Sequence, residues 1–141
     1  QALFGMNDKN RKAKLPELLE TLKLNGLEKQ YFEEYSRGNK QKFSITAAVS
    51  HHPKLLVIDE PIVGLDPTGA EIAKKMFTQF AKNGGSVLLV THTLPVAQEI
   101  SDRIGFLKNG ELVAVGTLAE LREKAGLGHD ADLNDIYKKL A

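Results

Sequence analysis

The chain has 141 residues, 42% of them hydrophobic and 26% charged, a composition typical of a globular domain with a hydrophobic core. Its formal net charge of +1 gives no electrostatic reason to expect a nucleic-acid partner, and the absence of cysteine excludes disulfides and thiolate chemistry. No apolar run approaches the roughly 20 residues that are needed to span a bilayer.

The first third of the chain is predicted to contain two helices. After a polar stretch over residues 1–11, leucines recur at near-helical spacing up to Leu24, and Asn25-Gly26 provides a helix stop. The simplest interpretation of these leucines is a helix that faces the core. Residues 28–34 form either a short turn of helix or a loop. A further helix is expected from near Gly38 to near His51.

The turn that opens this further helix has the composition of an anion site. It reads Tyr35-Ser36-Arg37-Gly38-Asn39, and the N-terminus of a helix presents unpaired N–H groups together with the positive end of the helix dipole. Taken alone, a serine cap followed by glycine is more often simply a helix cap.

A short apolar run, residues 55–58, ends in two adjacent carboxylates. Its composition favours a strand that is buried on both faces of a parallel sheet. Asp59 and Glu60 follow at the carboxyl end of this strand, where open α/β sheets place their chemistry. An isolated pair of this kind would more often be ordinary strand-ending acids or a helix cap.

The remainder alternates between helices and strands. Helices are predicted over residues 67–82, 94–100, 117–124 and 133–140, and strands over residues 86–91, 103–108 and 112–115. Asn109-Gly110 joins the last two strands as a hairpin turn. This order predicts an α/β fold with a mostly parallel sheet and one late hairpin.

Four of these segments, in this order, resemble the motifs of ABC-type ATPases. LLVIDEP, GLDP and VLLVTH look like the Walker B motif, the D-loop and the H-loop, and the resemblance covers about residues 38–116. The turn at Ser36 resembles the ABC signature, usually LSGGQ. Ser36, Gly38 and the trailing Lys40-Gln41 match it, whereas Tyr35 and Arg37 depart from it in the manner of the YS[K/R]G variant of exporter-type members, and Asn39 is a further departure that this variant does not cover. The implied fold is the P-loop NTPase (RecA-like) core of an ABC ATPase.

The resemblance also implies roles for individual residues. Asp59 would hold Mg²⁺ through a water, Glu60 would be the general base, and His92 would contact the γ-phosphate of the same ATP. The residues implied to bind the ATP of a second, head-to-tail ATPase domain are Ser36, Arg37, Gly38 and Asn39. The residues implied to form the D-loop interface with that domain are Gly64, Leu65 and Asp66.

The sequence contains no G-x-x-x-x-G-K-[ST] phosphate loop. The resemblance therefore implies the C-terminal portion of an ABC domain, in which residues 1–53 belong to the helical subdomain, 54–126 to the ATPase core and 127–141 to a helical tail. We expect this polypeptide alone to bind ATP weakly and to hydrolyse almost none. We also expect unpaired sheet edges, which the chain would resolve by rearranging or by associating with another copy.

The resemblance implies that the complete domain is an ATPase subunit that powers a membrane exporter and has no nucleic-acid partner. Its partners would be a second ATPase domain and a transmembrane permease subunit, and its place would be the cytoplasmic face of the cell membrane, attached through the permease. Two alternatives stay open: a non-catalytic interaction module with an ABC-like fold, and a soluble ABC ATPase without a transporter.

Overall fold

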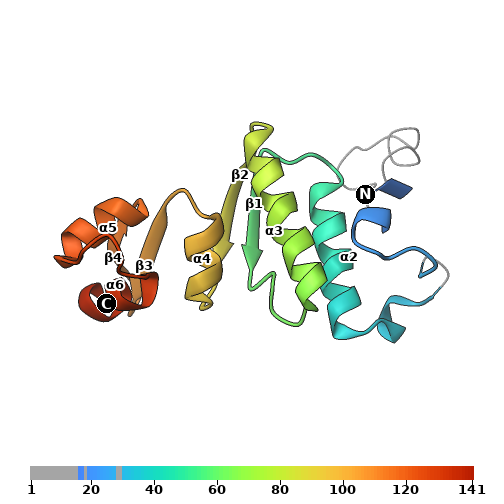
Figure 1. Ribbon diagram of the computed structural model, residues 1–141. Helices are drawn as coiled ribbons and strands as arrows, with labels where there is room; N and C mark the ends of the chain where they lie inside the picture. Colours follow the sequence, from blue (N-terminus) through green and yellow to red (C-terminus); the bar gives the residue numbers. More distant parts are fainter. Residues whose placement is uncertain (1–15, 18, 28–29) are drawn as a thin grey trace. The chain divides into compact units, whose positions relative to one another are not determined.

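The computed structural model describes residues 16–17, 19–27 and 30–141 (Figure 1). Its contacts divide the chain into two compact units, residues 1–90 and residues 91–141, which are described separately. The polar stretch 1–11 and the start of the first predicted helix lie outside the described residues. The predicted helix stop at Asn25-Gly26 is wrong: the helix ends at Thr21, because Lys23 already has a φ of +55° and the Leu24 N–H donates a hydrogen bond of 2.7 Å to the Leu19 carbonyl, and Gly26, with a φ of +86°, belongs to a later turn.

The first unit is built from two strands and the helices beside them. Its elements are η2 (Phe32–Glu34), α2 (Arg37–Val49), β1 (Leu55–Asp59), α3 (Pro67–Lys82) and β2 (Ser86–Val90). The strands β1 and β2 pair in parallel, from Leu55 opposite Ser86 to Asp59 opposite Val90. The helix α3 packs against β2 and against α2, and Figure 1 shows α2 and α3 side by side.

One face of the sheet in this unit is exposed. Leu56 is buried, with 4% of its surface exposed, whereas its neighbours Leu55 and Val57 are 55% and 62% exposed. On β2, Leu88 and Val90 are likewise 53% and 50% exposed. Successive side chains of a strand point to opposite faces, and within this unit the helices cover only the face of Leu56. The expectation of a strand buried on both faces is therefore wrong for these residues.

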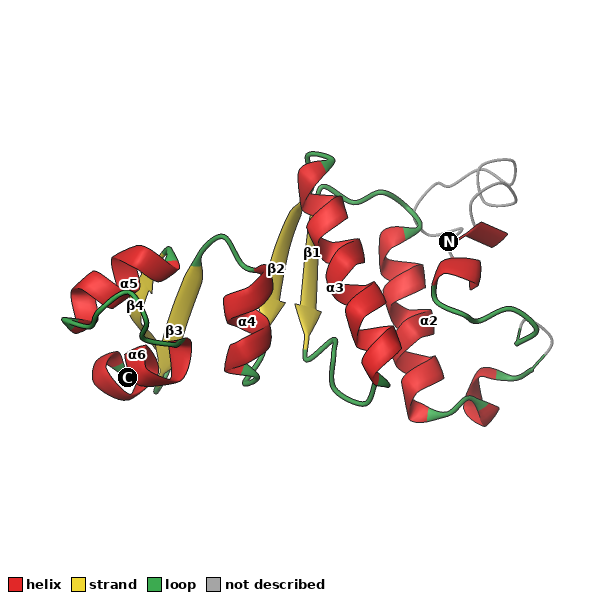
Figure 2. Cartoon of the chain, in the orientation of Figure 1, coloured by secondary structure: helices red, strands yellow, loops and turns green. Residues whose placement is uncertain are grey.

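The second unit contains an antiparallel hairpin and three helices. Its elements are α4 (Leu94–Ile100), β3 (Ile104–Lys108), β4 (Glu111–Gly116), α5 (Leu118–Ala125) and α6 (Leu133–Leu140) (Figure 2). The predicted hairpin is confirmed: β3 and β4 are antiparallel, and Asn109 and Gly110 both have positive φ, 52° and 83°, as a type I′ turn requires. The core of the unit consists of Ile104, Phe106, Ala114, Leu121, Leu133 and Ile136.

The helix ends follow from capping residues. Asp66 caps α3 and accepts a hydrogen bond from the Gly69 N–H, while Pro67 occupies the first helical turn, where its missing N–H costs nothing. In α5 the Thr117 hydroxyl and the Glu120 carboxylate form a capping box. None of the helices in the described part of the chain is long and apolar enough to cross a membrane.

Candidate functional site

The carboxyl end of β1 places two acidic residues next to each other in different surroundings. Asp59 is the last residue of the strand and is exposed, whereas Glu60 is half-buried. The Glu60 N–H donates a hydrogen bond of 2.9 Å to the carbonyl of Val90, which anchors Glu60 to β2. Glu60 also has a φ of +46°, a conformation that residues with a Cβ rarely adopt. Backbone strain of this kind is concentrated at functional sites, because only the surrounding structure can maintain it.

The donor chemistry at this strand end fits Mg²⁺ in one specific mode. Among the described residues, no group of three or more His, Cys, Asp or Glu side chains could hold a metal ion by itself. Mg²⁺ is, however, commonly bound by one or two carboxylates together with waters and substrate phosphates. The exposed carboxylate of Asp59 suits that arrangement.

The turn at the start of α2 has the geometry of a helix cap. Ser36 is the N-cap, and its hydroxyl accepts a hydrogen bond of 3.2 Å from the Asn39 N–H. Ser36 and Arg37 are exposed, and Gly38 and Asn39 are half-buried. The first turn of this 13-residue helix therefore presents backbone N–H groups close to the surface, as a phosphate oxygen requires.

The departure from the usual signature at Tyr35 has a packing explanation. The Tyr35 ring lies 5.8 Å from the ring of Phe32 and 5.9 Å from that of Phe43, measured between centroids. Its hydroxyl donates a hydrogen bond of 2.7 Å to the Leu27 carbonyl. Tyr35 thus anchors the residues before the turn through both ring contacts and a hydrogen bond.

The second turn, residues 64–66, lies against the start of α2. Gly64 has a φ of +86°, and a Cβ added at Gly38 would lie 3.0 Å from the Gly64 carbonyl oxygen. The structure therefore brings together two of the predicted motifs, the turn at Ser36 and the turn at Gly64. Their backbones approach so closely at Gly38 that glycine fits there better than a residue with a Cβ.

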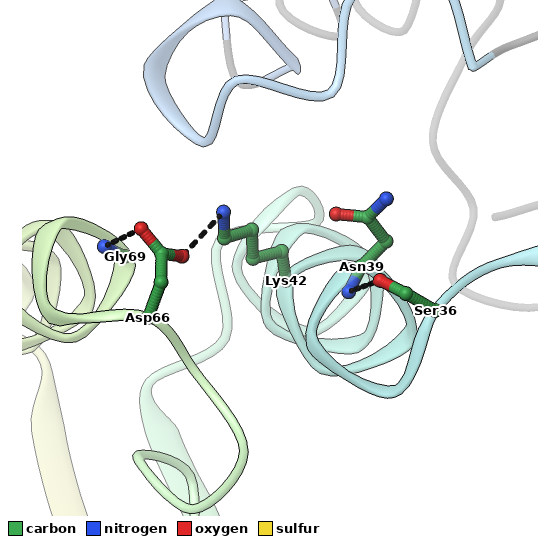
Figure 3. Close-up of polar contacts among 5 residues, drawn as sticks. All are labelled: Ser36, Asn39, Lys42, Asp66 and Gly69. Carbon is green, nitrogen blue, oxygen red and sulfur yellow. Dashed lines mark hydrogen bonds and ion pairs between the residues drawn. The ribbon is translucent and has the colours of Figure 1, made fainter.

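Asp66 connects this turn to both helices (Figure 3). One carboxylate oxygen accepts a hydrogen bond of 3.4 Å from the Gly69 N–H, and the other lies 3.1 Å from the Lys42 ammonium. The hydrogen bond from Lys42 holds the pKa of Asp66 below its ordinary value, against an opposing effect of burial. Sequence reasoning missed Lys42, whose only signal was its position in the Gln/Lys-rich segment that follows the signature-like turn.

His92 belongs to the second unit and is exposed. The strand β2 ends at Val90, one residue earlier than predicted, so His92 follows it by two residues; the neighbouring Thr91 hydroxyl accepts a hydrogen bond of 3.0 Å from the Thr93 N–H. The predicted contact of His92 with a phosphate remains a prediction.

Comparison with solved structures identifies the fold. The chain matches a structure described as the ATP binding subunit of an ABC transporter with a TM-score of 0.91 and 33% sequence identity, over 96% of this chain and 56% of that one. The fold is that of an ABC ATPase. A dimeric ATP-binding cassette in a post-hydrolysis state, bound to ADP and Pi, matches with a TM-score of 0.70 and 26% identity, over 80% of this chain and 49% of that one.

Sequence comparisons agree with this fold. The family model described as ABC transporter matches residues 3–63. The ABC-type transporter ATP-binding protein EcsA of Bacillus subtilis is 38% identical over 137 residues, which is 97% of this chain and 55% of that protein. The chain thus spans about half the length of each of these three proteins. The predicted ABC ATPase fold, α/β with a parallel sheet, is confirmed.

Proposed function

We propose that the chain is part of the ATP-hydrolysing subunit of an ABC transporter. The observation that carries the proposal is the similarity to an ABC-type transporter ATP-binding protein over 97% of the chain, at 38% identity. The structure is compatible with it, because Asp59 and Glu60 stand at the carboxyl end of a parallel strand, where α/β folds bind nucleotides.

For the nucleotide of its own subunit, we assign three residues. Asp59 would hold Mg²⁺ through a water, and the bound ion would neutralise charge on the phosphates. Glu60, next to it, would accept a proton from the attacking water, and its strained backbone would fix the direction of its carboxylate. His92 would contact the γ-phosphate.

For the nucleotide of a second ATPase domain, we assign the two turns that the fold places together. Ser36, Arg37, Gly38 and Asn39 would bind the phosphates of the partner's ATP at the N-terminus of α2. Gly64, Leu65 and Asp66 would form part of the interface with that domain. A dimeric ATP-binding cassette with ADP and Pi among the similar structures supports this arrangement.

The wider assignments rest on the same similarity. We propose a helical subdomain over residues 1–53, the ATPase core over 54–126 and a helical tail over 127–141. The remaining partner would be a transmembrane permease subunit, to which the protein binds at the cytoplasmic face of the membrane. The Tyr35-Ser36-Arg37-Gly38 turn supports an exporter, because it resembles the exporter-type signature variant.

The test is ATP hydrolysis by the complete subunit, compared with a Glu60→Gln variant. Gln has the shape of Glu but accepts no proton at neutral pH, so we expect hydrolysis to be lost while ATP binding is retained. Absence of hydrolysis in the unsubstituted protein, under conditions in which it folds and dimerises, would instead favour a non-catalytic interaction module. An active subunit that is isolated from its cells without any associated permease would favour a soluble ABC ATPase.

A further inference from the structure

The start of α2 and the turn before α3 contact each other through a buried cation that the sequence motifs do not predict. Lys42 lies in the second turn of α2 and is only 8% exposed, an unusual position for a lysine. Its ammonium lies 3.1 Å from the Asp66 carboxylate (Figure 3). The side chain of Asp66, in contrast, is 57% exposed.

Two glycines allow this contact to form. A Cβ added at Gly69 would lie 2.7 Å from the Lys42 Cε and 2.8 Å from an Asp66 carboxylate oxygen, so a larger residue at this position would displace the ion pair. At the other end of the contact, a Cβ added at Gly38 would lie 3.0 Å from the Gly64 carbonyl oxygen. The two segments therefore meet at both ends of the 64–66 turn: through backbone at Gly38 and through charge at Lys42.

The pair is asymmetric in what each member stabilises. Asp66 already caps α3 through the Gly69 N–H, so without Lys42 it would still be a solvated helix cap. Lys42, in contrast, lies in a buried position where a charge needs a partner. The ion pair thus determines where the 64–66 turn lies relative to α2, beyond what the cap alone would specify.

We propose that Lys42 is a positioning residue that holds the 64–66 turn against the start of α2, so that both turns meet a partner ATPase domain as one unit. The mechanical part of this inference concerns the chain itself. Its catalytic consequence rests on the proposed function, in which one turn binds the partner's nucleotide and the other contacts the partner domain.

The mechanical part is tested in the chain without nucleotide, with Lys42→Met and the conservative control Lys42→Arg. In Lys42→Met we expect the pKa of Asp66, measured by carboxyl NMR, to rise toward its ordinary value, and the amides of residues 64–66 to exchange faster with solvent. Lys42→Arg should restore both. An unchanged pKa and unchanged exchange in Lys42→Met would overturn the proposal.

A second variant keeps the test decisive if Lys42→Met does not fold. Gly69→Ala retains both charges but displaces the ion pair, because its Cβ would lie 2.7 Å from the Lys42 Cε and 2.8 Å from an Asp66 carboxylate oxygen. It should raise the pKa of Asp66 and speed exchange at residues 64–66 in the same way. If the pKa of Asp66 rises in Gly69→Ala but exchange at residues 64–66 is unchanged, the ion pair does not hold the turn.

The catalytic part is tested in the complete subunit. We expect Lys42→Met to lower kcat for ATP hydrolysis by about 10- to 100-fold, the scale that a small misplacement of a catalytic arrangement produces, with KM for ATP nearly unchanged. Lys42→Arg should recover most of the rate. If the unsubstituted subunit shows no hydrolysis, the proposed function fails, whereas the NMR measurement still decides the role of Lys42. Hydrolysis that is equal in Lys42→Met and in the unsubstituted subunit would refute the catalytic part alone.

Discussion

The left-handed backbone conformation of Glu60 leads to a quantitative prediction about the free energy of unfolding. Its φ of +46° costs a residue with a Cβ about 1–2 kcal/mol, a cost that glycine does not have. Glycine loses about 0.5–1 kcal/mol more conformational entropy on folding than alanine does. The difference predicts that Glu60→Gly is more stable than Glu60→Ala by about 1 kcal/mol. Both variants lack the carboxylate, so the contacts of the Glu60 side chain cancel in this comparison.

The assay is urea unfolding of the chain, followed by far-UV circular dichroism, with the midpoints compared at equal slope. The matched control is Lys75, an exposed residue in the middle of α3, where glycine should be less stable than alanine by about 1 kcal/mol. The sign of the alanine-to-glycine difference should therefore reverse between the two positions. If glycine is less stable than alanine at both positions, Glu60 does not have a left-handed backbone and the argument from strain fails.

Two further predictions concern charge and exposed surface. The hydrogen bond from Lys42 lowers the pKa of Asp66 below its ordinary value of 3.8. The ionised Asp66 therefore stabilises the folded chain above pH 3.8, and this stabilisation is lost as the pH falls through the lowered pKa of the folded state. When the free energy of unfolding in urea is measured between about pH 2 and 5, it should fall more steeply with decreasing pH in the unsubstituted chain than in Asp66→Asn. An equal dependence on pH in the two proteins would contradict this prediction. The exposed face of β1 and β2 predicts concentration-dependent self-association of the isolated chain in sedimentation experiments, reduced by Val57→Lys combined with Leu88→Glu, an oppositely charged cross-strand pair. A monomer at all concentrations would refute this.

Local signals in the sequence located most of the elements. The helices α3, α4 and α6 have the predicted bounds, 67–82, 94–100 and 133–140. For α3, Asp66 and Pro67 specify the start through a cap and a fixed φ, and both act within a few residues of the chain. The Asn109-Gly110 hairpin was equally predictable, because few residue pairs tolerate positive φ at two successive positions.

Properties that depend on distant parts of the chain were not predictable in this way. The apolar run 55–58 correctly indicated a strand, but its hydrophobicity could not show that Leu55 and Val57 are exposed. Burial depends on which elements cover each face of a sheet. In the same way, no local pattern distinguishes Lys42 from Lys40, the other lysine of α2, because Asp66, the ion-pair partner of Lys42, lies in a different part of the chain.

Glu60 and Asp66 lie at the two ends of one hydrogen-bonded segment. The Glu60 N–H is bonded to Val90 in the sheet, and Asp66 is bonded to Gly69 and Lys42 at the helices. Between them, the Val63 N–H donates to the Glu60 carbonyl at 3.3 Å and the Leu65 N–H donates to the Ile62 carbonyl at 3.2 Å. The segment is therefore hydrogen-bonded at both ends and within.

Displacing Asp66 would break its contact with Lys42 and strain the turn hydrogen bonds that lead back to Glu60. Under the proposed function, Asp66 contacts the partner domain and Glu60 activates water. The fold then gives contact with the partner a short, hydrogen-bonded connection to the catalytic carboxylate, and Lys42 fixes the end of that connection that faces the partner.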